Sequence, residues 1–192
     1  MLGDGLLGQM MEPTRFDHLP PPAPPEKPWA LTGQPGRPRN TIRSYRHTVD
    51  ALAKLNDSIQ AKYARICAEE TRFEQVGPAD ADVLLVAYGS PARMCRQVVE
   101  QPPASLKPSV ALFRPITLWP FPYADLARLA EGKRCVLTVE MSAGQLVEDV
   151  RLAVNGATPV ELLSRMGGRV PTAAEIAGAV EDLFCPKRGG AR

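Results

Sequence analysis

Residues 82–87, with the sequence DVLLVA, decide the fold of this chain. A continuous apolar run of this length is typical of a strand that is buried on both faces of a parallel sheet. Gly89-Ser90-Pro91 then turns the chain, and a helix is predicted over residues 91–100 with proline in its first turn. The run therefore predicts the first strand–helix unit of an α/β domain.

The same alternation of strand and helix continues along the chain. Further strands are predicted at 109–113 (SVALF), 135–139 (CVLTV) and 160–163. Helices are predicted between and after them, at 123–131, 143–154 and 172–184. The last helix has Thr172 as a candidate N-cap and Glu175 three residues later, which is a capping box. Because strands alternate with helices through short turns, we expect a small doubly wound α/β domain with a parallel sheet over residues 80–186.

The residues before this domain have a different composition. Residues 1–40 hold nine prolines, so residues 18–45 are expected to form an extended, proline-rich linker. Residues 46–76 are predicted to form one long amphipathic helix, since Leu52, Ile59, Ile66 and Phe73 recur every seven residues. This stripe has to pack on the chain's own domain, which is the simpler interpretation, or on a partner chain. Residues 187–192 are expected to be a disordered tail.

Composition excludes several classes of partner and site. With 23 basic and 21 acidic residues the net charge is +2, so neither nucleic acid nor an anionic membrane is an expected partner. No apolar run approaches the ~20 residues of a membrane span, and no secretory leader is recognisable. The four cysteines lie far apart without a CxxC pair, and the two histidines precede residue 48. A disulfide framework, a zinc site and an iron–sulfur site are therefore not expected, and we expect a cytoplasmic protein.

Gly3-Asp4-Gly5-Leu6-Leu7-Gly8 matches the glycine pattern of dinucleotide-binding proteins. That pattern works only after a buried strand and at the start of a helix, and here only two residues precede it. The same Gly-Asp-Gly also resembles the start of a magnesium–diphosphate signature but lacks its distal asparagine pair. We therefore expect no cofactor and no metal ion to be bound by this chain alone.

Polar side chains follow the carboxyl ends of the predicted strands, where ligands and partners meet an open parallel sheet. Arg114 could pair with Glu140 across these ends, or it could hold a carboxylate or phosphate; an internal ion pair or a domain contact is the simpler interpretation. No histidine follows residue 47, which excludes serine hydrolase chemistry within this chain. The candidate ligand or interface residues are Ser90, Arg114, Thr117, Glu140, Gln145 and Asp149.

The segment Trp119-Pro120-Phe121-Pro122 is aromatic and rigid. Exposed segments of this kind often lie in interfaces, so Trp119 and Phe121 are candidate interface residues. Ordinary packing of a loop is an equally good interpretation.

Four strings between residues 82 and 172 carry a family resemblance: VLLVAYGSPAR, FRPITLWPFP, VEMSAGQLVEDVRLAVNG and PVELLSRMGGRVPT. They resemble the C-terminal domain of the alpha subunit of 2-oxoacid:ferredoxin oxidoreductases, in the branch that acts on 2-oxoisovalerate (3-methyl-2-oxobutanoate) and 2-oxoglutarate. DGLLGQMMEP, at residues 4–13, resembles the end of that subunit's pyrimidine-binding domain, so residues 1–17 are expected to be its remnant. RPRN, at residues 37–40, and the long helix resemble the linker that follows.

The resemblance implies a transketolase C-terminal-like fold and a place in a larger enzyme. Such enzymes decarboxylate a 2-oxoacid on thiamine diphosphate and Mg²⁺, form an acyl-CoA and pass electrons through iron–sulfur clusters to ferredoxin. It implies beta, gamma and ferredoxin-like delta subunits as partners, with ferredoxin as an indirect one. Because the sequence starts within the family's first domain, we expect a fragment of the alpha subunit that is inactive alone, and no catalytic residue is assigned.

The other function compatible with the residues is a non-catalytic α/β module that holds a small anion or a partner protein at its strand-end loops. A thiamine enzyme outside the ferredoxin group, such as a dehydrogenase beta chain, is disfavoured by FRPITLWPFP.

Overall fold

The computed structural model describes residues 3, 5–11, 13, 15, 17, 20 and 23–184. The predicted tail at 187–192 lies outside the described residues, as do Asp4 of the Gly-Asp-Gly motif and parts of the segments predicted at 1–17 and 18–45. The chain divides into two compact units, one of residues 11–65 and the other of residues 1–10 with 66–192.

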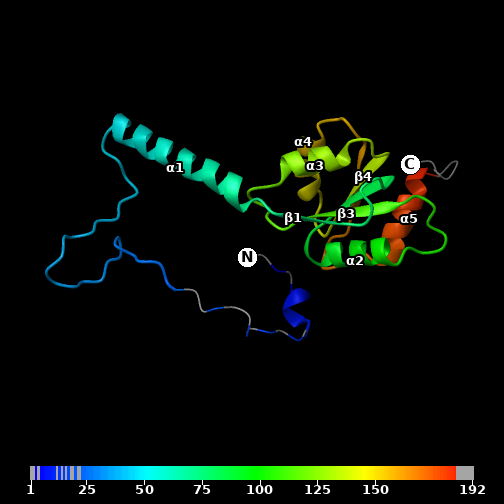
Figure 1. Ribbon diagram of the computed structural model, residues 1–192, viewed down its shortest axis with the longest axis horizontal. Helices are drawn as coiled ribbons and strands as arrows, with labels where there is room; N and C mark the ends of the chain where they lie inside the picture. The colour runs from blue at the N-terminus through cyan, green and yellow to red at the C-terminus, as the bar shows by residue number, and fades with distance from the viewer. Residues whose placement is uncertain are drawn as a thin grey trace. The chain divides into compact units, whose positions relative to one another are not determined.

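A five-stranded sheet forms the centre of the second unit (Figure 1). Its strand order is β1-β3-β2-β4-β5; β2 to β5 are parallel, and β1 pairs with β3 in the antiparallel sense. The predicted doubly wound α/β fold with a parallel sheet is confirmed for β2 to β5, and β1 is an antiparallel edge strand that was not predicted. The strands are β1 (Phe73–Val76), β2 (Val83–Val86), β3 (Val110–Pro115), β4 (Cys135–Glu140) and β5 (Val160–Ser164).

Helices cover both faces of this sheet. Figure 1 shows α3 and α4 on one face and α2 and α5 on the other. The alternating side chains of β2 explain why its sequence is apolar throughout, since Leu84 and Val86 enter one core cluster and Val83 and Leu85 the other. The helices are the 3-10 helix η1 (Leu7–Gln9), α1 (Val49–Glu70), α2 (Gly89–Glu100), α3 (Tyr123–Ala130), α4 (Leu146–Val154) and α5 (Ala173–Phe184).

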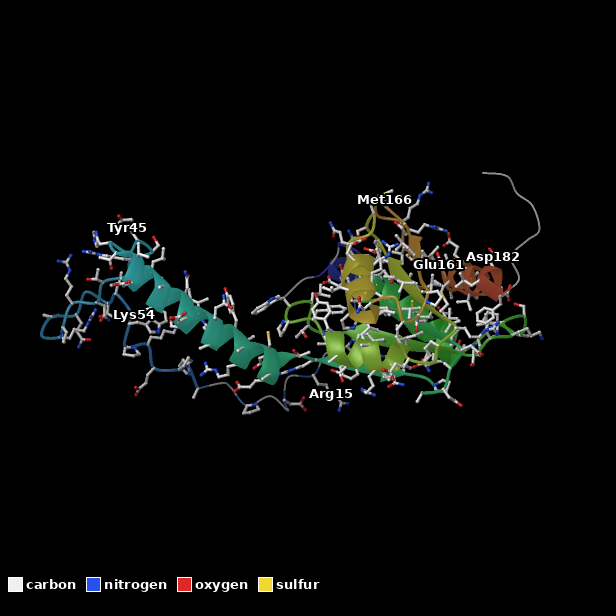
Figure 2. All side chains as sticks on the ribbon, turned by 90° about the horizontal axis from the view of Figure 1, so that it is seen from above. Arg15, Tyr45, Lys54, Glu161, Met166 and Asp182 are labelled. Atoms are coloured by element: carbon white, nitrogen blue, oxygen red, sulfur yellow. The ribbon has the colours of Figure 1, made fainter. Side chains whose placement is uncertain are left out.

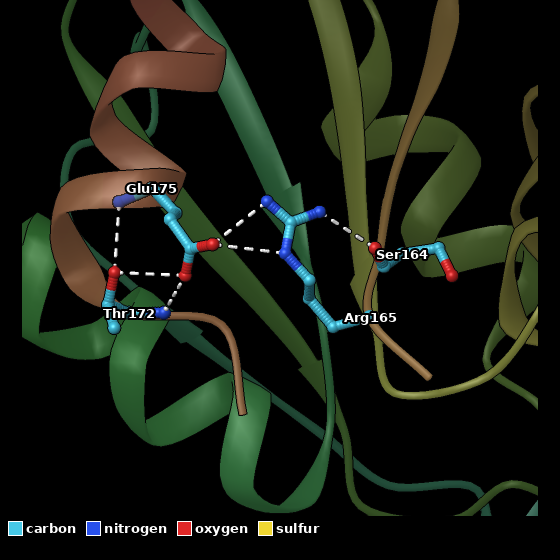
Figure 3. Close-up of polar contacts among 4 residues, drawn as sticks. All are labelled: Ser164, Arg165, Thr172 and Glu175. Atoms are coloured by element: carbon cyan, nitrogen blue, oxygen red, sulfur yellow. Dashed lines mark hydrogen bonds and ion pairs between the residues drawn. The ribbon is translucent and has the colours of Figure 1, made fainter. Parts of the chain in front are cut away.

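The predicted capping box at the start of α5 is confirmed (Figure 3). The Glu175 backbone N–H donates to Thr172 Oγ1 over 3.2 Å, and Thr172 donates its own N–H to the Glu175 carboxylate over 2.8 Å. Arg165, which follows β5, adds two donors to the same carboxylate at 3.0 and 2.9 Å. These bonds fix the start of α5 against the end of β5.

The predicted helix over 46–76 is wrong at its C-terminal end. The helix ends at Glu70, and residues 73–76 form the edge strand β1. Phe73, counted in the heptad stripe, leaves that stripe and stacks on Phe113 of β3 with 5.0 Å between ring centroids. Sheet pairing and aromatic packing outweigh the helical pattern of these four residues.

The helix α1 presents its side chains to solvent, and none of its residues is buried. Leu52 and Tyr63 of its apolar stripe are 48% and 43% exposed. Figure 2 shows the side chains of α1, Lys54 among them, projecting from the helix. Packing of this stripe, on the chain's own domain or on a partner chain, stays a prediction. Within the described residues, no helix has both the length and the apolar character needed to cross a membrane.

Candidate functional site

The carboxyl ends of β2 and β4 are neighbours whose following loops turn to opposite faces of the sheet. The chain leaving β2 enters α2 on one face, and the chain leaving β4 enters α4 on the other. In open α/β sheets such a reversal is where ligands commonly bind. Most candidate residues from the sequence lie at or near this edge.

The carboxylate of Glu140 caps the N-terminus of α4. The side chain is buried, with 2% exposed, and accepts hydrogen bonds from the backbone N–H groups of Gln145, Leu146 and Val147 at 2.9–3.1 Å. Ser142 Oγ donates to the same carboxylate. Because helix N-termini favour negative charge, these bonds stabilise the buried carboxylate. Glu140 therefore fixes the loop before α4 rather than facing a ligand.

Arg114 does not pair with Glu140, contrary to one expectation from the sequence. Its guanidinium donates to the carboxylate of Glu74, the residue opposite it on β1, over 3.0 Å. Arg96 of α2 reaches the same carboxylate over 2.7 Å. Hydrogen bonds first from Arg96 and then from Arg114 lower the pKa of Glu74. The internal ion pair expected for Arg114 exists, but its partner comes from the strand that the sequence did not predict.

The next three candidate residues are Thr117, Ser90 and Gln145, and each has a position that the fold explains. Thr117 Oγ1 accepts a hydrogen bond from the Arg72 N–H over 2.9 Å, which ties the loop after β3 to the start of β1. Ser90 lies in the first turn of α2 and is only 3% exposed, so its hydroxyl is not accessible as a nucleophile. Gln145 occupies the N-cap position of α4 with its side chain exposed.

A groove of about 640 Å³ lies between the end of α1 and the segment 118–125. Its floor is largely aromatic and proline-rich, and Phe121 packs on Tyr123 with 4.9 Å between ring centroids. Asp149 reaches the groove from α4 and accepts a hydrogen bond of 2.5 Å from the Tyr123 hydroxyl. The lining residues are Cys67, Ala68, Thr71, Leu118, Trp119, Pro120, Phe121, Pro122, Tyr123, Ala124, Asp125 and Asp149.

The hydrogen bond from Tyr123 to Asp149 holds a carboxylate at the wall of this groove. That bond is the main cause that raises the pKa of Tyr123 to about 12, and burial and the Asp149 charge add to it. The phenol therefore keeps its proton at neutral pH and holds the carboxylate in place.

The two candidate interface residues differ in exposure. Phe121 is 7% exposed and belongs to the core cluster under α3 and α4, so it is not a surface anchor. Trp119 is 58% exposed and lines the groove. The structure thus brings Trp119 together with Asp149. Sequence reasoning did not include Tyr123 or Cys67 in this site; the aromatic–proline run pointed to Tyr123, whereas nothing in the local sequence indicates Cys67.

The described residues do not fit thiamine diphosphate, magnesium or an iron–sulfur cluster. The backbone N–H groups at the start of α4, which would suit a diphosphate, are already bonded to Glu140. Among the described residues, no three His, Cys, Asp or Glu side chains gather where they could hold a metal ion. Cys95 and Cys135 are buried, and burial raises the pKa of both thiols, which disfavours the thiolate that a cluster requires.

The family model described as pyruvate:ferredoxin oxidoreductase core domain II matches residues 81–176, half of the chain. The chain belongs to this 2-oxoacid:ferredoxin oxidoreductase family. The matched residues run from the start of β2 into the first turn of α5, so they contain the parallel part of the sheet. The family resemblance stated from the sequence strings is confirmed.

Curated relatives extend this match beyond the family domain. Ketoisovalerate oxidoreductase subunit VorB from Methanothermobacter thermautotrophicus is 38% identical over 95% of this chain and 51% of the relative, and VorB from Methanothermobacter marburgensis gives the same values. 2-oxoglutarate synthase subunit KorA from Methanothermobacter marburgensis is 34% identical over 50% of this chain and 26% of the relative. The chain spans about half the length of the VorB relatives.

A solved structure of this oxidoreductase family shares the fold. It is 2-oxoglutarate:ferredoxin oxidoreductase from Magnetococcus marinus with 2-oxoglutarate, coenzyme A and succinyl-CoA bound. The structural match covers 72% of this chain and 24% of the solved chain, with a TM-score of 0.62 and 20% sequence identity.

Proposed function

We propose that this chain is the C-terminal part of the alpha subunit of a thiamine diphosphate-dependent 2-oxoacid:ferredoxin oxidoreductase. In the assembled enzyme, a 2-oxoacid undergoes oxidative decarboxylation to an acyl-CoA, with ferredoxin as the electron acceptor. The chain acts there as a structural and interface domain and is inactive by itself.

The match to VorB over 95% of this chain is the observation that carries the proposal. The geometry agrees with a supporting role, since the polar strand-end residues Arg114, Thr117 and Glu140 bond to other parts of the chain. The chain also keeps apolar surface on α1 and at Trp119, which suits contacts with other subunits.

Thiamine diphosphate, Mg²⁺ and the iron–sulfur clusters are then held by the remaining parts of the enzyme. The partners are beta and gamma subunits and a ferredoxin-like delta subunit, and ferredoxin is reached indirectly. The assembled enzyme is expected in the cytoplasm, where thiols such as Cys67 stay reduced.

Reconstitution tests this proposal. The chain is co-expressed with the beta and gamma subunits and with the segment that corresponds to the other half of a VorB-like subunit. Reduction of a viologen dye is followed with coenzyme A and either 3-methyl-2-oxobutanoate or 2-oxoglutarate. We expect activity only when all parts are present, and a matched preparation without this chain serves as the control. Dye reduction by the isolated chain, or full activity without it, would contradict the proposal.

A further inference from the structure

The groove beside residues 118–125 carries an unbalanced negative charge. Its ionisable lining groups include two carboxylates, Asp125 and Asp149, and no lysine or arginine. Asp125 forms an ion pair with Arg128 over 3.2 Å. Within the described part of the chain Asp149 has no ion pair, and its one hydrogen-bond partner is the neutral phenol of Tyr123. The side chain of Asp149 is partly exposed, so a cation from another chain can reach its carboxylate.

The walls around Asp149 suit one particular cation. The indole of Trp119 is 58% exposed, and Tyr123 is 38% exposed while its hydroxyl holds the carboxylate. A guanidinium can bind a carboxylate while its flat face and aliphatic stem lie against aromatic rings. A lysine ammonium is more strongly hydrated and lacks the planar face, so it suits these walls less well.

The size and floor of the groove indicate a protein segment rather than a single side chain. A volume of about 640 Å³ exceeds what one arginine fills, and the remaining lining is mostly apolar. Such a surface suits an arginine flanked by aliphatic residues, with the charge on Asp149 and the flanking residues against the exposed apolar lining at Ala68 and Ala124.

We propose that this groove is a docking site for an arginine-bearing, apolar-flanked segment of a partner protein, with Asp149 as the anchor and Trp119 as the stacking surface. The inference rests on the proposed role of the chain as an interface domain and adds the chemistry of the partner.

Tryptophan fluorescence of the full chain tests the proposal. The sequence holds two tryptophans, so a Trp29→Phe background leaves Trp119 as the reporter inside the groove. The probe is a blocked Leu-Arg-Leu tripeptide, and the matched probe is a blocked Leu-Gln-Leu tripeptide. We expect a saturable change in Trp119 emission with the arginine peptide and an affinity at least about tenfold weaker for the glutamine peptide, because a charge-assisted hydrogen bond is lost.

Two variants in the same background locate the binding site. Asp149→Asn is expected to lower the affinity for the arginine peptide by about tenfold. Glu148→Gln, at an exposed neighbour on α4 that pairs with Arg151 and does not line the groove, is expected to leave the affinity unchanged. Urea unfolding curves for each variant verify that the fold is kept. If Asp149→Asn unfolds, Tyr123→Phe is used in its place, because it removes the hydrogen bond that holds Asp149. Tyr123→Phe is also expected to weaken binding of the arginine peptide.

Three results would overturn the proposal: equal affinity for both peptides, equal affinity of the Asp149→Asn and Glu148→Gln proteins, or a concentration-dependent self-association that shields Trp119 without peptide. The last result would make a second copy the occupant. Failure here leaves the subunit role intact, because that role fails only in the reconstitution assay.

Discussion

The carboxylate of Glu140 replaces an external anion at the start of α4. Glu140→Gln keeps the size of the side chain but removes the charge that three backbone N–H groups share. We expect the free energy of unfolding to fall by about 1.5–3 kcal/mol, as for other hydrogen bonds to a buried charged group. Urea denaturation measures the change. Glu131→Gln, at an exposed carboxylate after α3, is the control and should unfold as wild type; equal curves for both variants would show that the Glu140 charge contributes nothing.

Glu175 makes stability depend on pH. The Thr172 backbone N–H, then Arg165, then the Thr172 hydroxyl lower its pKa from 4.5 to about 2. Since the folded pKa lies below the unfolded one, this contribution is present above pH 4.5 and is lost as the pH falls toward 2. We expect Glu175→Gln to unfold at a lower urea concentration than wild type at pH 7, and the difference to shrink between pH 4.5 and 2. A difference that stayed constant across this range would refute the assignment.

At the residue scale, the sequence predicted which side chains lie near the strand ends but not what they bind. The sequence is compatible with Arg114 binding Glu140, a ligand or another domain, whereas its partner Glu74 lies on β1, 40 positions earlier in the chain. Periodicity and spacing report which face a residue occupies and carry no information about a cross-strand partner in an unpredicted element. The capping box at Thr172 and Glu175 was predictable because both groups lie within one helical turn.

At the element scale, Gly77 controls how β1 joins the sheet. Its φ is +91°, and an added Cβ would lie 2.7 Å from Val99 Cγ1 and 3.1 Å from the carbonyl oxygen of Val110. Gly77→Ala therefore combines backbone strain with overpacking, and we expect a loss of about 2–4 kcal/mol in the free energy of unfolding. Gly132→Ala is the matched control, because its φ is +71° with open space around the Cβ. It should cost about 1 kcal/mol, and equal losses would exclude the steric contribution.

The elements that the sequence predicted well are those buried on both faces. The run at 82–87 and the parallel strands after it have apolar patterns that only a covered sheet explains. The strand β1 was missed because Phe73 continues the heptad of the preceding helix, so the local pattern favours the wrong element. Pairing of β1 with β3 and the stacking of Phe73 on Phe113, contacts between residues about 40 positions apart, select the strand.

At the scale of the whole molecule, stability is unevenly distributed. The central strands β2 and β4 are completely buried, whereas no residue of α1 is. An isolated helix of 22 residues is marginally stable in water. We expect backbone amides of α1 in the isolated chain to exchange with deuterium within seconds to minutes, and those of β2 and β4 to need hours. Hydrogen exchange followed by mass spectrometry measures both, and protection of α1 equal to that of β2 would contradict this expectation.

The exposed surface of α1 has a consequence for the abundance of the chain in a cell. A helix that opens readily offers cleavage sites to proteases, and an apolar side chain such as Leu52, which is 48% exposed, is of the type that quality-control chaperones bind. Copies that find no companion would be degraded sooner than assembled ones. Supply of this polypeptide would then follow the supply of whatever covers α1, without any dedicated regulator.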